Sequence, residues 1–192
     1  ERKNSIDIND GYGIQLSVNS IKLLNNIGFN KFNNNQLYFP KKVNFLNAKD
    51  SKKICDIDLS KFNNENNYYT TLKRSKLIEF LLGGIPKDKL IFNCELNDIK
   101  QGDKTSLLFS DNKTDEFDYL VAADGVYSKT KQILFQKEGL PEYDNTIALR
   151  GSIKDFNNLD ISLHLGSNFH FLIYPINQNK EFNFIAIIRK KF

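Results

Sequence analysis

The stretch DYLVAADGVYSKTKQ, residues 118–132, decides the fold more than any other part of the sequence. An apolar run leads through two alanines to Asp124 and Gly125, and Ser128 follows as a residue that can cap a helix. Small residues let a backbone approach a ligand closely, glycine tolerates unusual backbone angles, and a helix N-terminus favours an anionic phosphate. The pattern predicts a strand, a turn and a helix, which is either a cofactor-binding turn or an ordinary strand–turn–helix.

Helical and strand-like patterns alternate on both sides of this turn. Residues 13–28 predict a helix that is entered from a loop, with Ser17 or Asn19 as its cap and Gly28 at its end. Further helices are predicted at residues 70–82 and 128–135, and strands at residues 41–48, 52–60, 90–99, 106–110, 117–122, 146–153, 161–165, 169–176 and 182–189. This order predicts an α/β fold in which the chain crosses twice between an α/β domain and a separate sheet.

Composition indicates a folded globular protein. Of 192 residues, 40% are hydrophobic and 26% are charged, and a disordered chain would be poorer in aromatic residues than one with 16 Phe and 8 Tyr. The net charge of +4 is scattered, which is weak evidence for nucleic acid, so we expect no nucleic-acid partner. No signal-peptide pattern or apolar stretch of membrane-spanning length is present, so we expect a cytoplasmic protein without an integral membrane segment.

Two further features concern completeness and metal binding. The chain contains no Met and opens on Glu1, so we expect it to be a fragment of a longer protein. Cys55 and Cys94 are isolated from each other and from any histidine at metal-ligand spacing. We therefore expect no metal site and no disulfide framework.

Residues 118–132 resemble the Asp-Gly fingerprint of the class A FAD-dependent aromatic monooxygenases, the p-hydroxybenzoate and salicylate hydroxylase type within the ubiquinone-pathway hydroxylase superfamily. In that family a strand ends in ADG and continues into SxxR, and the aspartate meets the ribityl region of the flavin. The resemblance implies that Asp124 and Gly125 bind the cofactor. Lys131 stands where the family usually has arginine, and lysine lacks the planar fork that makes bidentate contacts.

Two N-terminal segments extend the resemblance. GYGIQLSVNSIKLLNNIGF, residues 11–29, is similar to the family pattern GAGIQLSPNALRALRALGL, which passes near the isoalloxazine and so implies a cofactor role for Gln15. Family members carry an acidic residue before this segment, often followed by arginine, that holds the adenosine ribose. The matching residues here are Glu1 and Arg2.

A later segment, LKRSKLIEFLL at residues 72–82, resembles the family's HRADLLRLLL helix start, in which the arginine reaches the flavin side of the site. The resemblance implies that Arg74 contacts the cofactor. Without a family context, Arg74 would be a surface residue on an amphipathic helix.

The last match lies in the β-rich tail. ALRGSI at residues 148–153 and HLGSNFHFLIYPI at residues 164–176 are similar to the family's substrate-domain strands. Alternation along the second segment places His170 and Tyr174 on one strand face. Some phenol-hydroxylating relatives use a His and a Tyr four residues apart to hold and deprotonate the ring hydroxyl, a role that suits the titration range of histidine. The resemblance implies catalytic roles for both, although a histidine on a sheet face is more often structural.

The resemblance also implies an architecture. We expect an incomplete FAD-binding Rossmann-like domain of the glutathione-reductase type, interleaved with a mainly β substrate domain. Residues 1–35 and 67–140 would belong to the FAD-binding domain, and residues 36–66 and 141–192 to the substrate domain. The GxGxxG fingerprint is expected upstream of Glu1, and the GDAxH-type motif after Phe192.

The implied activity is hydroxylation of a small aromatic substrate, phenolic or salicylate-like, with FAD, NAD(P)H and O2. Alternatives on the same scaffold are an epoxidase, a halogenase or a ubiquinone-biosynthesis hydroxylase. A non-catalytic binding module or remnant is an alternative of another class. The 192-residue fragment alone is expected to be inactive.

Overall fold

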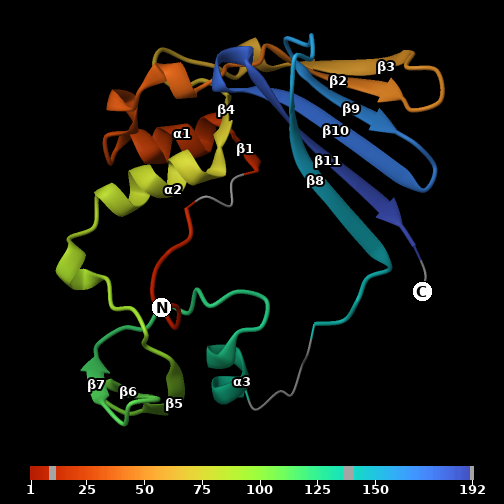
Figure 1. The fold of residues 1–192 in the computed structure, drawn as a ribbon. Coiled ribbons are helices and arrows are strands. Elements are labelled where there is room, and N and C mark those ends of the chain that lie inside the picture. The colour runs from red at the N-terminus through yellow and green to blue at the C-terminus, as the bar shows by residue number, and fades with distance from the viewer. Residues whose placement is uncertain (9–11, 136–140, 191–192) are drawn as a thin grey trace. The chain divides into compact units, whose positions relative to one another are not determined.

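The computed structural model describes residues 1–8, 12–135 and 141–190, drawn in Figure 1. The chain forms two compact units, one of residues 1–7 and 85–144 and one of residues 8–84 and 145–192. The predicted mixed α/β class is confirmed. The division into the four predicted domain segments stays a prediction, and the end of its third segment, residues 136–140, lies outside the described residues, as does Gly11 of the second motif.

The larger unit is built on a six-stranded sheet in the order β3-β2-β9-β10-β11-β8. All neighbours are antiparallel except β2 and β9, which are parallel. The strands are β2 (Lys42–Asn47), β3 (Lys53–Asp58), β8 (Thr146–Lys154), β9 (Ile161–Leu165), β10 (Phe169–Ile176) and β11 (Glu181–Arg189). The four predicted strands of the β-rich tail are thereby confirmed.

A short two-stranded ribbon forms the second element of this unit. Strand β1 (Gly13–Leu16) pairs antiparallel with β4 (Thr70–Lys73), and each strand leads directly into a helix, α1 (Val18–Asn25) or α2 (Arg74–Gly83). Short 3-10 helices complete the unit: η1 (Phe29–Lys31), η2 (Asn34–Gln36), η3 (Leu59–Lys61) and η5 (Asn177–Asn179). We call β1 and β4 together the ribbon.

The ribbon corrects two sequence predictions. Residues 13–16, the first part of the segment predicted as a helix entered from a loop, form a strand, and the predicted start of the second helix at Thr70 is wrong because residues 70–73 are strand. Backbone pairing between the two segments explains both changes, since it satisfies their N–H and C=O groups without a helix. Ser17 occupies the predicted cap position of α1, and Gly28 follows the helix with a φ of 93°.

The two faces of the ribbon meet different surroundings. Ile14, Leu16, Thr70 and Leu72 alternate onto what we call the helix face. Leu16 and Leu72 belong to a core cluster with Ile21, Phe29 and Leu37, against which Phe80 of α2 also packs. The opposite, sheet face carries Gly13, Gln15, Thr71 and Lys73.

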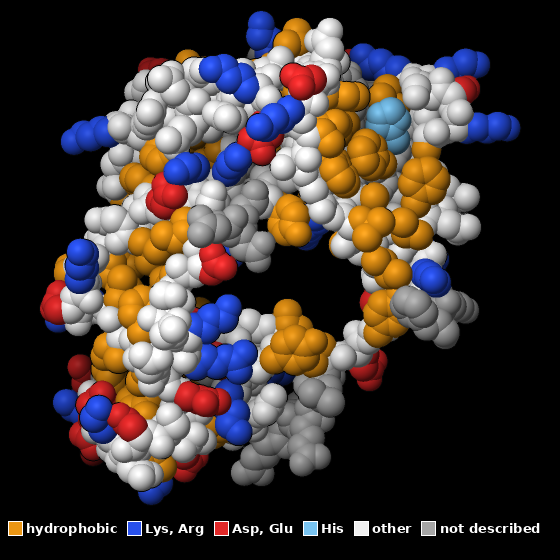
Figure 2. All heavy atoms as spheres, in the orientation of Figure 1, with side chains coloured by type: hydrophobic (Ala, Val, Ile, Leu, Met, Phe, Trp, Pro, Cys, Tyr) orange, Lys and Arg blue, Asp and Glu red, His pale blue; other side chains and the backbone are white. Residues whose placement is uncertain are grey.

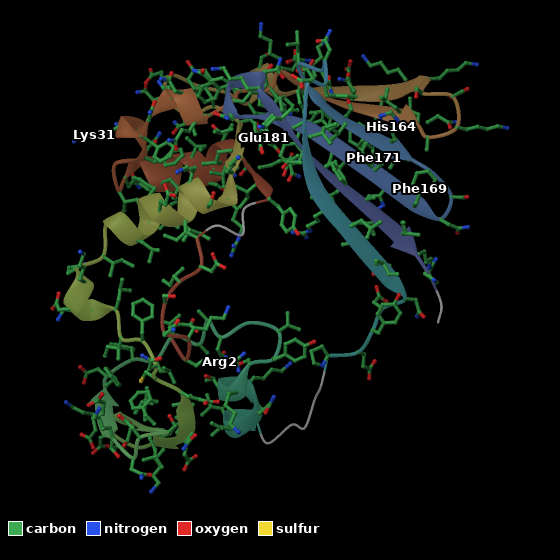
Figure 3. The ribbon with its side chains drawn as sticks, in the orientation of Figure 1. Arg2, Lys31, His164, Phe169, Phe171 and Glu181 are labelled. Carbon is green, nitrogen blue, oxygen red and sulfur yellow. The ribbon has the colours of Figure 1, made fainter. Side chains whose placement is uncertain are left out.

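Polar contacts tie the sheet face of the ribbon to β10 and β11. The backbone N–H of Gly13 donates to Oδ1 of Asn183 over 2.6 Å, and Asn183 is completely buried. The Thr71 hydroxyl donates to the carbonyl of Pro175. The Lys73 ammonium lies 2.7 Å from the carboxylate of Glu181, which Figure 3 labels. These contacts fix the ribbon against the sheet.

The faces of the six-stranded sheet also differ. One face packs Ile161, Tyr174 and Ile176 against Leu59 in a second core cluster. The other carries an aromatic row in which Phe171 lies 6.1 Å from His164 and 5.9 Å from Phe184, ring centre to ring centre. Figure 2 shows hydrophobic side chains gathered beside a histidine, and Figure 3 labels His164 and Phe171 at this place.

The smaller unit contains an antiparallel three-stranded sheet of β5 (Leu96–Gln101), β6 (Thr105–Phe109) and β7 (Thr114–Phe117). Helix α3 (Lys129–Phe135) contacts β5, and η4 (Lys87–Lys89) precedes the sheet. The N-terminal residues are held here, because the N–H of Cys94 donates to the carbonyl of Glu1 over 2.9 Å. Across the described ranges, no helix is long and apolar enough to cross a membrane.

Two predicted strands of this unit are corrected. The strand predicted at residues 90–99 begins only at Leu96. The strand predicted at residues 117–122 is wrong beyond Phe117, because no described strand pairs with this segment. Tyr119 and Val121 remain 90% and 86% exposed. An apolar run forms a stable strand only where a neighbouring strand pairs with its backbone.

We predict that Gly13→Ala destabilises the larger unit. A Cβ at Gly13 would lie 2.6 Å from Cβ of Asn183 and 2.9 Å from the ring of Tyr174, so the ribbon would have to move. We expect a loss of about 1–3 kcal/mol in the free energy of unfolding, measured with urea. Gly83→Ala is the matched control, because nothing lies within 4 Å of its Cβ position and alanine favours helix. An equal effect of both substitutions would contradict the prediction.

Candidate functional site

Asp124 caps helix α3 of the smaller unit. Its Oδ1 accepts the Ser128 hydroxyl over 2.6 Å, and its Oδ2 accepts the Thr130 N–H over 2.9 Å. The Ser128 hydroxyl in turn accepts the N–H of Lys131 over 3.0 Å, which confirms Ser128 as a helix cap. Burial opposes ionisation of Asp124, but the hydrogen bonds from Ser128 and Thr130 lower its pKa to about 2. The predicted cofactor ligand therefore carries a firmly ionised carboxylate.

Gly125 supplies the backbone conformation of this turn. Its φ of 79° lies in the left-handed region that favours glycine. Nothing lies within 4 Å of the position that a Cβ would take, so the space beside Gly125 is open. Val126 and Tyr127, the next two residues, are 75% and 73% exposed. The turn thus presents an open and partly apolar surface beside the Asp124 carboxylate.

Glu1 and Arg2 also lie in the smaller unit. The Glu1 carboxylate accepts the N–H of Lys3 over 3.0 Å, and the terminal amino group donates to the carbonyl of Ile91 over 2.9 Å. The hydrogen bond from Lys3 lowers the pKa of Glu1, with smaller contributions from neighbouring positive charges. Arg2, labelled in Figure 3, is exposed. Within the described residues its guanidinium forms no ion pair.

Gln15 and Tyr174, predicted for different roles, meet in the larger unit. The Tyr69 hydroxyl donates to Oε1 of Gln15 over 2.8 Å, and the Gln15 side chain also interacts with Tyr174, because it partly offsets the rise in the pKa of that phenol. Tyr174 is 1% exposed. Burial raises the pKa of Tyr69 and raises that of Tyr174 further. Both phenols therefore keep their protons at neutral pH, and the Tyr69 hydroxyl is the donor to Gln15.

Arg150 is a member of this cluster that the sequence prediction did not include. It lies on β8, opposite Ile185 of β11, and its side chain is exposed. The register puts Arg150 on the same face of the sheet as Tyr174, and its positive charge opposes the rise in the pKa of Tyr174. The sequence signal was the RG pair at residues 150–151, which marked a strand without indicating the face to which the arginine points.

His170 lies farther along β10. It shares a strand face with Tyr174, but four residues of strand separate their Cα atoms by about 13 Å. His170 lines a separate small cavity of about 210 Å3 together with Asn168 and Arg189. The structure thus brings Tyr174 to Gln15 and leaves His170 outside this cluster, and its acid–base role stays a prediction.

Arg74 begins α2, and its backbone N–H donates to the carbonyl of Tyr12 over 2.8 Å. Its guanidinium is exposed and forms no ion pair within the described ranges. The described residues contain no group of three or more His, Cys, Asp or Glu side chains that could hold a metal ion.

Comparison with known proteins identifies flavin-dependent relatives. No family model matches the chain. The FAD-dependent monooxygenase eupB of Phoma sp is 26% identical over 130 residues, which cover 60% of this chain and 29% of eupB. Salicylate hydroxylase of Pseudomonas putida is 24% identical over 138 residues, which cover 62% of this chain and 32% of that enzyme. The chain matches less than a third of the length of these two relatives.

Solved structures show the same fold. HpxO of Klebsiella pneumoniae, in complex with FAD and uric acid, superposes on 100% of this chain and 49% of its own, with a TM-score of 0.83 and 15% identity. A substrate complex of salicylate hydroxylase covers 94% of this chain and 49% of its own, with a TM-score of 0.79 and 16% identity. The resemblance to flavin-dependent aromatic hydroxylases is confirmed.

We predict that the Asp124 carboxylate titrates near pH 2. Because its pKa lies below the ordinary value of about 3.9, the ionised group stabilises the start of α3 above pH 4, and this stabilisation is lost as pH falls toward 2. Ser128→Ala should move the midpoint upward, because it removes one hydrogen bond to the carboxylate. Carboxyl carbon NMR shifts measure the midpoint, with Ser110→Ala as the control. A titration midpoint of Asp124 near pH 3.9 in the wild-type protein would contradict the proposal that its carboxylate caps α3.

Proposed function

We propose that this chain is part of an FAD-dependent monooxygenase that uses NAD(P)H and O2 to hydroxylate an aromatic, phenolic or salicylate-like substrate. The observation that supports this most is the cluster of Gln15, Tyr69 and Tyr174, in which the Tyr69 hydroxyl donates to Gln15 and the buried Tyr174 interacts with the same side chain. It joins the segment predicted to pass near the flavin to the strand predicted to hold the substrate. Relatives named as FAD-dependent monooxygenases, and the FAD and uric acid complex of HpxO, support the same activity. A cytoplasmic location is part of this proposal.

The side chains available fit the chemistry of a flavin dinucleotide. In the smaller unit, Arg2 is an exposed cation that pairs with no acid among the residues described, so it is available to a phosphate group; Arg74 is a similar exposed cation in the larger unit. The Glu1 carboxylate is an acceptor for ribose hydroxyls. Asp124 and Gly125 offer an ionised carboxylate beside open space. FAD, reduced by NAD(P)H, would supply the redox and oxygen chemistry, and these residues would hold it.

The larger unit would orient the aromatic ring. Arg150 offers an exposed guanidinium beside the buried Tyr174, so a ring carboxylate or phenolate can pair with the arginine. Burial raises the pKa of Tyr174, so the phenol stays protonated, and the surrounding core holds its ring in place. His170 would move a proton to or from the ring hydroxyl in the role predicted from the sequence.

Other oxidative outcomes on the same scaffold are an epoxidase, a halogenase or a ubiquinone-pathway hydroxylase. The similarity to salicylate hydroxylase favours ring hydroxylation. A non-catalytic remnant differs from all of these because it would not retain the flavin.

We predict that the complete protein containing this chain purifies with FAD and that Asp124→Ala lowers flavin retention about tenfold or more, because a charged hydrogen-bonding group is lost. Asp124 also caps α3, so Ser128→Ala, which keeps the carboxylate, should retain most of the flavin. Asp111→Ala in the β6–β7 turn is the matched control. Visible absorbance after gel filtration measures retention. A colourless wild-type protein without FAD affinity would refute the proposal.

We predict that aromatic acids or phenols stimulate NAD(P)H oxidation by the same complete protein. Arg150→Gln should raise the KM for salicylate about tenfold or more and change the KM for an uncharged phenol little, because the guanidinium pairs with the carboxylate. His170→Phe should lower kcat for the best phenol. Steady-state rates with hydroxylated product quantified would test both. Unchanged kinetics in His170→Phe would remove this residue from the mechanism.

A further inference from the structure

A cavity of about 700 Å3 opens in the larger unit on the helix side of the ribbon. This volume lies in the range of small-molecule sites. Its floor is made by Ile21 of α1, Phe29 of η1, Leu37 and Thr70, whose exposed fractions are 5% or less. The floor therefore belongs to the packed core, and its shape is set by α1 and the ribbon.

Two aromatic side chains stand at the edge of this cavity. Phe39 and Tyr68 lie with their ring centres 5.7 Å apart and their planes at 60°, and both line the cavity. They remain 40% and 43% exposed, which is unusual for aromatic residues that contact each other beside a core. A flat aromatic ring between them and Phe29 would gain stacking and edge contacts.

The polar part of the wall is neutral apart from one cation. Asn25 donates over 3.1 Å both to the carbonyl of Asn66 and to Oδ1 of Asn67, which holds the loop at residues 60–68 against α1. Among the described residues that line the cavity, Lys41 is the one charged side chain, and none is Asp or Glu. Within the described part of the chain, the Lys41 ammonium forms no ion pair. A ligand with one negative charge matches this wall.

This cavity is separate from the cluster of Gln15, Tyr69 and Tyr174. Thr70 lines the cavity from the helix face of the ribbon, whereas Gln15 and Thr71 lie on the sheet face. The Thr71 hydroxyl bonds to Pro175 of the sheet, on the side away from the cavity. The ribbon therefore stands between the two sites.

We propose that the cavity is a second ligand site, which binds a planar aromatic carboxylate of one or two fused rings. The rings contact Phe29, Phe39 and Tyr68, and the carboxylate pairs with the Lys41 ammonium. Asparagine amides around the opening donate hydrogen bonds to further oxygens of the ligand. This site does not depend on the proposed monooxygenase activity, since it uses neither Gln15 nor Tyr174.

The test uses 6-hydroxy-2-naphthoate as a fluorescent probe, because the chain has no Trp to compete with its signal. We expect the protein of this sequence to bind it with a dissociation constant on the order of 0.1 mM. Asn66→Phe and Asn30→Phe, which alter two different segments of the lining, should each weaken binding at least tenfold by filling the cavity. Lys41→Gln should weaken it several-fold and leave the binding of the uncharged 6-hydroxy-2-naphthamide unchanged.

Two controls locate the probe. Lys22→Gln, an exposed lysine of α1 outside the cavity, should leave binding unchanged. Arg150→Gln should also leave it unchanged, and a large loss there would assign the probe to the Tyr174 cluster and overturn the proposal. Wild-type affinity in both filling variants, equal affinity for the amide, or no binding up to 5 mM would overturn it as well. Circular dichroism shows whether each variant is folded. If a cavity-filling variant does not fold, the test is decided by comparing the binding of the carboxylate and the amide to Lys41→Gln.

Discussion

The hydrogen bond from the backbone of Gly13 to the buried side chain of Asn183 is the constraint on which the larger unit depends. It holds β1 of the ribbon against β11 of the sheet. At this point there is no room for a side chain on Gly13. The salt bridge between Lys73 and Glu181 acts at the neighbouring strand. Together they fix the ribbon so that its two faces serve different purposes.

The division between these faces explains how one short ribbon carries both a packed core and a polar cluster. Leu16 and Leu72 enter the core, whereas Gln15 accepts a hydrogen bond from Tyr69 beside the buried Tyr174. Burying polar groups is costly unless they are paired, and Gln15 supplies the partner for the Tyr69 hydroxyl. Nδ2 of Asn183 is a buried donor without a partner. The Asn183 side-chain amide thus keeps its bond to Gly13 although only its oxygen, and not its nitrogen, is paired within the described residues.

The β-rich tail was predictable from the sequence because its strands are five to nine residues long and rich in β-branched and aromatic residues. The four-residue strands of the ribbon were not predictable. Each is too short to show a period-2 pattern, and the pairing of Gly13 with Lys73 joins segments that are far apart in the sequence. The opposite error occurred at Tyr119 and Val121, where an apolar pattern has no neighbouring strand. Local sequence reports the preference of a segment and not the presence of its partner.

The candidate site divides in the same way. Asp124 and its serine cap lie within a few residues of each other, so the turn could be predicted from its motif. The meeting of Gln15 with Tyr174 depends on tertiary packing, and the contribution of Arg150 depends on strand register. The alternation of side chains along a strand predicted that His170 and Tyr174 share a face. The rise per residue over four residues nevertheless keeps the two side chains apart.

The contact between Gly13 and Asn183 joins residues 170 positions apart. During synthesis, Gly13 leaves the ribosome long before its partner exists, so the ribbon can form early but cannot dock onto the sheet until β11 has emerged. Contacts of such long sequence separation are slow to form because loop closure comes first. The polar cluster around Gln15 therefore matures only after β11 has been translated, and a nascent chain that stops before Asn183 exposes the unpaired edge of its ribbon to chaperones.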